Sequence, residues 1–352
     1  MKIAVIPGDG IGVEVVAEAL RVLEAVRPFL RQPIETVTFD WGAERYLRDG
    51  TTLPAGAAED LASNYAAILF GALGDKRVPE QIHARDILLG LRFTLDLYIN
   101  LRPVKLLDDR LTPLQGRTTR DIDMVVLREN TEGLYAGIGG NFKRGTPDEV
   151  AINEDLNTRK GVDRILRAGF ELARQRRKKL CMSDKANALT YAHGLWQRAF
   201  AAMRAEYPDV EASHLYIDVA AMEFVRAPDR FDVVVTSNMF GDILTDLGAA
   251  IVGGLGLAPS GNIHPGRCSL FEPVHGSAPD IAGRGLANPL GAISSLALLL
   301  RHVGEDPVAD RIDAAVARSV KKGHTTKDLG GTLSTRGAAD QVIAELAQGD
   351  GA

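Results

Sequence analysis

The 352-residue sequence lacks the features that mark several classes of protein. Its two cysteines, Cys181 and Cys268, are too few for a disulfide framework and lack metal-ligand spacing, which favours a reducing compartment. The 41 basic residues are outnumbered by 46 acidic ones, so no basic surplus suggests binding to nucleic acid. The most apolar tract, residues 286–300, is too short to span a bilayer. Because the start also lacks a signal-peptide pattern, we expect a cytoplasmic protein.

The hydrophobic pattern predicts alternating strands and helices. Short apolar runs at residues 2–6, 66–70, 124–127 and 233–236 indicate strands, and amphipathic spacing at 12–26 and 161–176 indicates helices. This alternation predicts an α/β protein with a largely parallel sheet. The exception is a polar, glycine-containing stretch that predicts an extended hairpin or, alternatively, a surface loop, at residues 138–157.

A glycine-rich turn joins the first predicted strand to the first predicted helix. Its glycines are Gly8, Gly10 and Gly12, whereas the Rossmann fingerprint requires its third glycine where Val13 stands. The motif is therefore only weak support for dinucleotide binding. Backbone N–H groups of such a turn can still hold an anion.

An acidic pair is the strongest local signal for chemistry. Asp242 and Asp246 are four residues apart, so on a helix both carboxylates project from one face beside apolar residues. Two adjacent carboxylates repel each other and lose hydration, so a cation would stabilise them. Oxygen-only ligands favour Mg²⁺ or Mn²⁺. The alternative is a solvated acidic face.

Candidate anion-binding and proton-transfer groups also occur in apolar surroundings. Arg92, Arg102 and Arg128 have the planar fork that binds carboxylates, and with a metal site they suggest a small polycarboxylate substrate. They could instead be surface or ion-paired arginines. Lys185 is a candidate general base, although alone it does not differ from a surface lysine. Residues 271–283, including His275, form a long structured loop of the kind that commonly binds ligands.

Together these segments resemble the β-decarboxylating dehydrogenases, which comprise isocitrate, 3-isopropylmalate, homoisocitrate and tartrate/D-malate dehydrogenases. Six ordered motifs carry the resemblance: Ile6-Pro-Gly-Asp-Gly-Ile-Gly12, Asn100-Leu-Arg-Pro103, Arg128-Glu-Asn-Thr-Glu-Gly133 with Tyr135, Asp184-Lys-Ala-Asn187, Asn238-Met-Phe-Gly-Asp-Ile-Leu-Thr-Asp246, and Glu272-Pro-Val-His-Gly-Ser-Ala-Pro-Asp280.

The resemblance implies an isocitrate/isopropylmalate dehydrogenase-like, non-Rossmann fold of two α/β domains. Residues 1–100 and 253–352 would form a discontinuous nucleotide-binding domain, and residues 101–252 a substrate and dimerisation domain. An arm at about 138–157 would interlock two subunits, so a homodimer with shared active sites is expected.

The resemblance also implies the chemistry. Oxidative decarboxylation of a hydroxy-dicarboxylate would use Lys185 as base and Tyr135 as the acid that protonates C3. The three arginines would bind the substrate carboxylates. Asp218 would join Asp242 and Asp246 as a metal ligand, and Lys185 and Asp218 would reach into the neighbouring subunit's site. A catalytically silent subunit is the alternative from another class, but the lysine, tyrosine and aspartates are all present.

The cofactor implied by the resemblance is NAD. Asp280 stands where the NADP-using branch has lysine, and an acid there would bind the ribose hydroxyls and repel a 2′-phosphate. Residues in corresponding positions would contact the cofactor: Ile11, Leu73, Glu272, His275, Gly276, Ser277, Ala278, Asp280, Ile281 and Asn288.

The branch of the family, and so the substrate, is predicted from positions at which this chain differs from isopropylmalate enzymes. Isopropylmalate enzymes read Thr-Gly-Gly-Ile-Tyr at the acid tyrosine and have valine three residues after the lysine, where this chain has Glu132-Gly-Leu-Tyr135 and Ala188. Ala188 would face Leu88 and Leu89 in the pocket for the C3 substituent and leave it wider and less apolar. These differences favour tartrate/D-malate activity, as do segments that resemble that branch more closely, at residues 98–104, 139–140, 158–166, 258–260 and 269–273. Against this, Leu88 and Leu89 precede Arg92 as in the apolar pocket of isopropylmalate enzymes. Isopropylmalate is the second reading, and homoisocitrate or another 3-substituted malate remains open.

Overall fold

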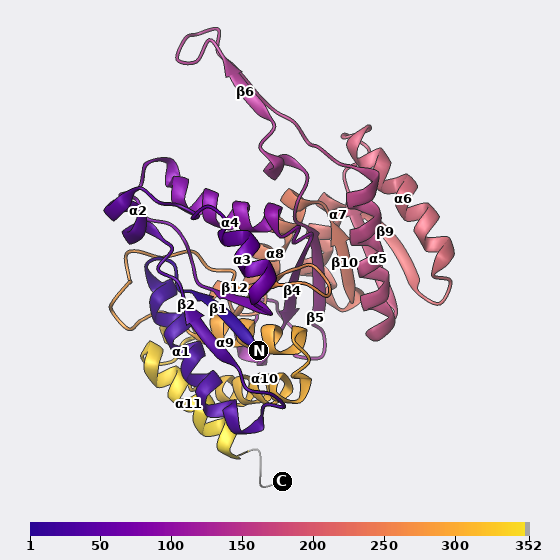
Figure 1. The fold of residues 1–352 in the computed structure, drawn as a ribbon. Coiled ribbons are helices and arrows are strands. Elements are labelled where there is room, and N and C mark those ends of the chain that lie inside the picture. The colour runs from indigo at the N-terminus through magenta and orange to yellow at the C-terminus, as the bar shows by residue number, and fades with distance from the viewer. Residues whose placement is uncertain (349–352) are drawn as a thin grey trace. The chain divides into compact units, whose positions relative to one another are not determined.

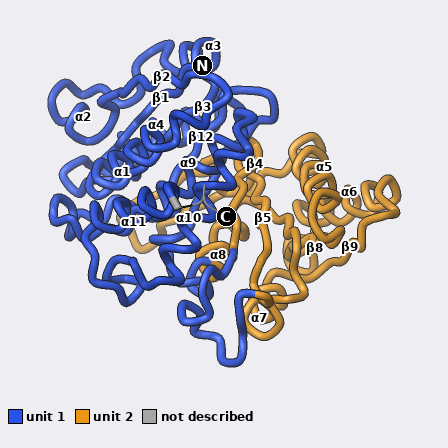
Figure 2. The backbone as a smooth tube through the Cα atoms, turned by 90° about the horizontal axis from the view of Figure 1, so that it is seen from below, with its two compact units in different colours: residues 1–97, 105–119, 249–352 blue, residues 98–104, 120–248 orange. Residues whose placement is uncertain are grey.

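The computed structural model describes residues 1–348 and divides the chain into two compact units. Unit 1 comprises Met1–Leu97, Lys105–Thr119 and Ala249–Ala352, and unit 2 comprises Tyr98–Val104 and Arg120–Gly248 (Figure 2). Both units contain parallel strands with helices, so the predicted α/β fold is confirmed. No helix in the described residues is long and apolar enough to cross a membrane.

Unit 1 contains a five-stranded, mostly parallel arrangement in the order β2-β1-β3-β12-β11, in which only the β11–β12 pair is antiparallel. Its strands are β1 (Lys2–Ile6), β2 (Glu35–Thr38), β3 (Ala67–Phe70), β11 (Pro259–Ile263) and β12 (Ser269–Pro273). Its helices are α1 (Ile11–Val26), α2 (Ala43–Asp49), α3 (Ala57–Asn64), α4 (Ile82–Thr94), α9 (Leu290–His302), α10 (Asp306–Lys321) and α11 (Thr335–Gln348).

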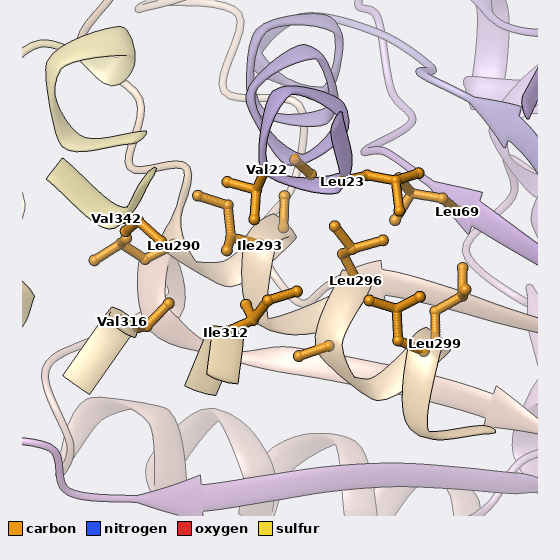
Figure 3. Close-up of a cluster of buried hydrophobic side chains, with 14 of the residues drawn as sticks. Val22, Leu23, Leu69, Leu290, Ile293, Leu296, Leu299, Ile312, Val316 and Val342 are labelled. Carbon is orange, nitrogen blue, oxygen red and sulfur yellow. The ribbon is translucent and has the colours of Figure 1, made fainter. Parts of the chain in front are cut away.

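Two hydrophobic cores form because alternate strand residues point to opposite faces of this sheet. Val5 and Leu69 pack with α1, α9, α10 and α11 in one core, part of which Figure 3 shows. Ile6 and Ile68 pack with residues of α3 and α4 in the other. The apolar runs therefore lack a polar side because both of their faces are buried.

Unit 2 has the strand order β4-β5-β10-β8-β9. Its strands are β4 (Ile99–Lys105), β5 (Asp123–Glu129), β8 (Lys179–Asp184), β9 (Glu211–Tyr216) and β10 (Val233–Thr236). Its helices are α5 (Arg159–Gln175), α6 (Ala192–Glu206), α7 (Ile217–Arg226) and α8 (Asn238–Ala250). Single-turn 3-10 helices lie in the two units at Arg27–Phe29, Pro79–Gln81, Asp109–Leu111, Leu134–Ala136, Pro228–Arg230, Leu255–Leu257 and Lys327–Leu329.

The polar stretch at 138–157 forms an exposed hairpin that projects from unit 2 (Figure 1). Strands β6 (Gly139–Phe142) and β7 (Val150–Asn153) pair antiparallel, and every residue of both is exposed. The hairpin interpretation is therefore confirmed, and we call this hairpin the arm. A lone two-stranded hairpin is marginally stable in water, so the arm has little support within its own chain.

Candidate active site

The candidate catalytic groups of unit 2 follow the carboxyl ends of neighbouring parallel strands. Thr236 at the end of β10 lies opposite Arg128 of β5 and Ser183 of β8, and Asp184 of β8 lies opposite Tyr216 of β9. Lys185 is the first residue after β8, and Asp218 is the second residue after β9. Because the strands are parallel, these groups share one sheet edge, the edge at which α/β proteins bind ligands.

Arg128 is fixed in a buried polar network. Its Nε and Nη2 donate to Oδ1 of Asn238 at 2.9 and 2.7 Å, and its Nη1 forms an ion pair with Asp242. The Asn238 amide also donates to the carbonyl of Glu132 at 2.9 Å. Gly241 makes this approach possible, because a Cβ there would lie 2.6 Å from Cβ and Cγ of Arg128. Sequence reasoning missed Asn238, whose signal is its place between a buried strand and the acidic helix.

The two acidic residues of α8 lie beside this network. Asp242 accepts a hydrogen bond from Tyr135 at 2.8 Å, and its Oδ1 lies 3.4 Å from Nη2 of Arg102. The Oδ1 of Asp246 is 3.8 Å from Nη1 of Arg102. Burial raises the pKa of the Asp246 carboxyl, while the charge of Arg102 opposes this shift. Asp242 is thus paired with Arg128, whereas the more exposed Asp246 has the longer contact with Arg102.

The donor set suits a divalent cation in part. Two carboxylates on one face of α8 supply the hard oxygen ligands that Mg²⁺ and Mn²⁺ prefer. Nowhere in the described residues do three or more histidine, cysteine, aspartate or glutamate side chains form a group that could hold a metal. Within the described residues of one chain, Asp218 is thus not grouped with Asp242 and Asp246.

Arg102 and Tyr135 are oriented by groups on α8. Nη1 of Arg102 donates to Oγ1 of Thr245 at 2.6 Å, a contact that sequence reasoning missed. The guanidinium of Arg128 lies 5.0 Å from the centre of the Tyr135 ring. Burial, together with the hydrogen bond to Asp242, raises the pKa of the Tyr135 phenol. The phenol is thereby kept protonated, as an acid must be.

Lys185 and Asp218 form a separate pair. Nζ of Lys185 donates to Oδ1 of Asp218 at 2.6 Å, and this bond holds the pKa of the Asp218 carboxyl below its usual range. The backbone N–H of Lys185 donates to Nδ1 of His193 at 3.0 Å. Ala188 is exposed in the turn that follows.

Arg92 lies in unit 1, near the end of α4. The side chain is buried, and its Nη2 donates at 3.1 Å to Oε1 of Glu272, which also accepts from Asn262 at 2.8 Å. The Nε atom of Arg92 is buried without a partner in the described residues. Leu88, on the same helix, is partly buried against a hydrophobic core, and Leu89 is half-buried.

The loop after β12 carries most of the predicted cofactor residues. Nδ1 of His275 contacts the Gly276 carbonyl at 3.0 Å, whereas its Nε2 is buried without a partner in the described residues. Burial also lowers the pKa of this imidazole, which favours a neutral ring with hydrogen-bonding capacity to spare. Asn288 donates to Asp328 at 2.9 Å, and Asp280 is exposed. The unused, buried nitrogen fits a loop that binds a ligand.

The glycine-rich turn supports this loop by backbone contacts. The N–H of Ile11 donates to the Ser277 carbonyl at 2.8 Å, and the N–H of Asp9 donates to the Ala72 carbonyl at 2.7 Å. Gly10 has a φ of 54°, and a Cβ there would lie 2.1 Å from the Ser277 carbonyl oxygen. These two N–H groups donate within the chain and are therefore not available to an anion.

The remaining predicted cofactor residues also lie in unit 1. Ile11 is buried, and Leu73 is partly buried against a hydrophobic core. Ala278 has a φ of 38°, in the left-handed region that strains a residue with a side chain. Ile281 is partly buried against the large core. Unit 1 thus contains every predicted cofactor residue together with Arg92, whereas unit 2 contains the other predicted catalytic, metal and carboxylate-binding residues.

Comparison with known proteins identifies near full-length relatives. The 3-isopropylmalate dehydrogenase of Thermobifida fusca is 50% identical over 351 residues, covering 99% of this chain and 98% of the relative. The 3-isopropylmalate dehydrogenase of Corynebacterium jeikeium is 51% identical over 351 residues, covering 98% and 100%.

These relatives overturn the prediction of a tartrate/D-malate branch. Two of the departures on which that prediction depended, at Glu132 and Ala188, are residues whose structural roles are local. The carboxylate of Glu132 accepts hydrogen bonds from the backbone N–H and the hydroxyl of Thr158 at 2.8 and 2.5 Å, so it stabilises the chain rather than marking a substrate. Ala188 is exposed within its own chain. Neither residue is therefore a reliable marker of the C3 substituent.

The wider comparisons agree on family and fold. The solved isocitrate dehydrogenase of Methylococcus capsulatus superposes with a TM-score of 0.89 at 37% identity, covering 98% of this chain and 99% of that one. The family model for isocitrate/isopropylmalate dehydrogenases matches residues 2–343. The chain therefore belongs to the isocitrate/isopropylmalate dehydrogenase family, and it is a decarboxylating dehydrogenase that acts on a CH–OH group.

Proposed function

We propose that the chain catalyses the NAD⁺- and divalent-metal-dependent oxidative decarboxylation of 3-isopropylmalate. The observation that carries this proposal is the name shared by relatives about half identical over nearly the whole chain. The apolar side chains of Leu88 and Leu89, which precede Arg92 on α4, support it because an isopropyl group requires an apolar pocket.

Three arginines would bind the two substrate carboxylates. Arg102 and Arg128 each hold a fixed orientation through hydrogen bonds to neutral groups, Thr245 and Asn238. Arg92, oriented by Glu272, would complete the set. Bidentate guanidinium–carboxylate pairing would fix the substrate with its C2 hydroxyl toward the acidic face of α8.

Asp242 and Asp246 would hold Mg²⁺ or Mn²⁺, which when bound supplies Lewis-acid polarisation of the substrate oxygens. The unprotonated amine of Lys185 would accept the proton of the C2 hydroxyl as the hydride leaves C2. Loss of CO₂ from the carboxylate on C3 would then leave an electron pair on C3. Tyr135, whose raised pKa keeps the phenol protonated, would donate a proton to that carbon.

NAD⁺ would bind to unit 1 and supply the hydride acceptor. The exposed carboxylate of Asp280 would bind the adenosine ribose hydroxyls and repel a 2′-phosphate. The buried Nε2 of His275 and the buried Ser277 would provide further contacts. The remaining cofactor positions would be Ile11, Leu73, Glu272, Gly276, Ala278, Ile281 and Asn288.

A homodimer would complete the metal site. Exposed apolar side chains lie on α7 and α8 at Met222, Val225 and Ile243, and on the arm at Phe142 and Ile152. Such exposed apolar surfaces on two helices and an unsupported hairpin are typical of subunit interfaces. A second copy would bring its Lys185 and Asp218 to Asp242 and Asp246.

The test is a spectrophotometric assay of NADH formation with purified protein, Mg²⁺ or Mn²⁺, and a panel of malates that differ only at C3. We expect kcat/KM for 3-isopropylmalate to exceed that for D-malate, tartrate and homoisocitrate. Chelation should abolish turnover, and sedimentation should give a dimer. Equal or greater turnover of a malate lacking the isopropyl group would overturn the substrate assignment.

A further inference from the structure

His193 holds the backbone at Lys185, although it belongs to none of the motifs that define the family resemblance. Its side chain on α6 is buried, and its Nδ1 accepts the Lys185 N–H at 3.0 Å. A ring nitrogen that accepts carries no proton, so the neutral ring carries its proton on Nε2. That nitrogen lies 3.5 Å from Oδ2 of Asp155. A carboxylate, an imidazole and the peptide group of Lys185 are thus linked in series.

The carboxylate belongs to a short segment, residues 155–158, that follows strand β7 and that we call the arm base. On one side it is bonded to the loop that carries Tyr135. The N–H of Gly133 donates to the Leu156 carbonyl at 2.7 Å, and the Glu132 carboxylate accepts from Thr158. The arm base therefore fixes the polypeptide leading to Tyr135.

On its other side the arm base is bonded to α6. Oδ1 of Asn157 accepts from Nε1 of Trp196 at 2.8 Å, and Asp155 approaches His193. His193 and Trp196 are three residues apart and so lie on the same face of the helix. Two separate side-chain contacts thus join the arm base to the helix that holds Lys185.

We infer that His193, oriented by Asp155, is a positioning residue for Lys185, and that the arm base couples the position of this lysine to the arm. The inference depends on the proposed function for the role of Lys185 as base. Proton transfer requires the amine within hydrogen-bond reach of the substrate hydroxyl, so a small backbone displacement would lower kcat. Lys185 would then be correctly placed only when the arm is.

The first test compares two replacements of the same histidine. His193→Phe keeps a buried ring but removes the acceptor, and we expect kcat to fall about ten- to hundred-fold with the KM for NAD⁺ unchanged. His193→Asn retains an acceptor oxygen near the position of Nδ1 and should recover most of kcat. His302→Phe, a histidine replacement in unit 1 that leaves the site residues intact, should have parental kcat and serves as the control.

The second test does not depend on turnover. The amine of Lys185 is bonded to Asp218, whereas Lys179, at the other end of β8, forms a looser ion pair at 3.4 Å and serves as internal reference. Acetylation with acetic anhydride, read by peptide mass spectrometry, should increase at Lys185 relative to Lys179 in His193→Phe but not in His193→Asn. Asp155→Asn should also increase the acetylation of Lys185 relative to Lys179, but by less. If His193→Phe does not fold, Asp155→Asn takes its place in this test.

The inference is overturned if His193→Phe, or Asp155→Asn in its place, changes neither kcat nor the acetylation ratio, or if the Phe and Asn variants lose kcat equally. A parent protein inactive on 3-isopropylmalate, combined with the expected acetylation pattern, would refute the proposed substrate and leave the positioning role of His193 intact.

Discussion

The two units position their candidate site residues by different kinds of contact. In unit 1 the loop after β12 is held by backbone contacts, in which the turn at Gly10 approaches the Ser277 carbonyl too closely for any side chain. In unit 2 the corresponding contacts are made by side chains, chiefly the buried Arg128 and Asn238 and the half-buried Asp242. Substitutions in unit 1 should therefore displace a cofactor loop, whereas those in unit 2 should remove charges from the chemistry.

Asp242→Asn should give the largest loss of activity. Unchanged activity would contradict the view that the side chains of unit 2 carry the chemistry. The change removes the carboxylate that pairs with Arg128, accepts from Tyr135 and would bind the metal. We expect kcat/KM to fall by about 10³-fold or more, equivalent to roughly 4 kcal/mol of transition-state stabilisation. Steady-state kinetics would measure the loss, and circular dichroism would verify the fold. Asp163→Asn, a helical aspartate with a surface ion pair, is the control.

Gly10→Ala should have the next largest effect and act through the cofactor. A Cβ would collide with the Ser277 carbonyl oxygen at a residue with positive φ, so the turn or the loop must move. Strain of about 1–3 kcal/mol predicts a rise of about ten-fold or more in the KM for NAD⁺, with kcat less affected. Gly116 also has a positive φ, but a Cβ there would meet nothing within 4 Å. Gly116→Ala is therefore the control that has the backbone strain without the collision. Equal effects of the two changes would contradict the collision argument.

The contrast between the units also explains what the sequence could predict. The first strand, the first helix and the strand at 233–236 were predicted nearly to the residue, because apolar periodicity depends only on neighbours along the chain. Asp242 and Asp246 could be found because their helical spacing is itself the signal. The polar, glycine-containing composition of the arm predicted either a hairpin or a surface loop, and the structure has the hairpin.

The partners of the site residues could not be predicted from the sequence. Asn238 and Thr245 act by meeting Arg128 and Arg102, which lie far away along the chain, and His193 meets the backbone N–H of Lys185. The local sequence does not reveal any of these partners. The substrate branch was wrong for a related reason. Glu132 was interpreted as a family marker, but it bonds to Thr158 at the start of a helix.

Asp280→Lys tests whether unit 1 selects the cofactor. Replacing the exposed carboxylate by an ammonium removes repulsion of a 2′-phosphate and supplies a partner for it. We expect the ratio of kcat/KM for NAD⁺ to that for NADP⁺ to fall by an amount worth roughly 2–3 kcal/mol. Glu59→Lys, with the same charge change on an exposed helix of unit 1, should leave the ratio unaltered. A parent enzyme that already prefers NADP⁺ would show that Asp280 does not select the cofactor.

The smallest expected difference is in local stability. Each unit contains one buried cysteine whose reactivity reports how often that part of the fold opens. Burial raises the pKa of Cys268 in unit 1 to about 12 and that of Cys181 in unit 2 to about 11. At pH 8 these values leave about one thiol in 10⁴ and one in 10³ ionised, respectively, against roughly one in four for an exposed cysteine. Both thiols should therefore react with a disulfide reagent mainly through opening of the fold.

The two thiols should open at different rates. Cys268 lies just before β12 and lines a cavity of about 740 Å³, so a local fluctuation can expose it. Cys181 lies within β8, paired on both sides with β9 and β10, so its exposure requires separation of strands. We expect Cys268 to be labelled faster at pH 8, and dilute urea to accelerate Cys181 more steeply because its opening exposes more surface. Direct reaction in the folded state would reverse the order, because Cys181 has the larger thiolate fraction; peptide mass spectrometry of timed samples distinguishes the two cases.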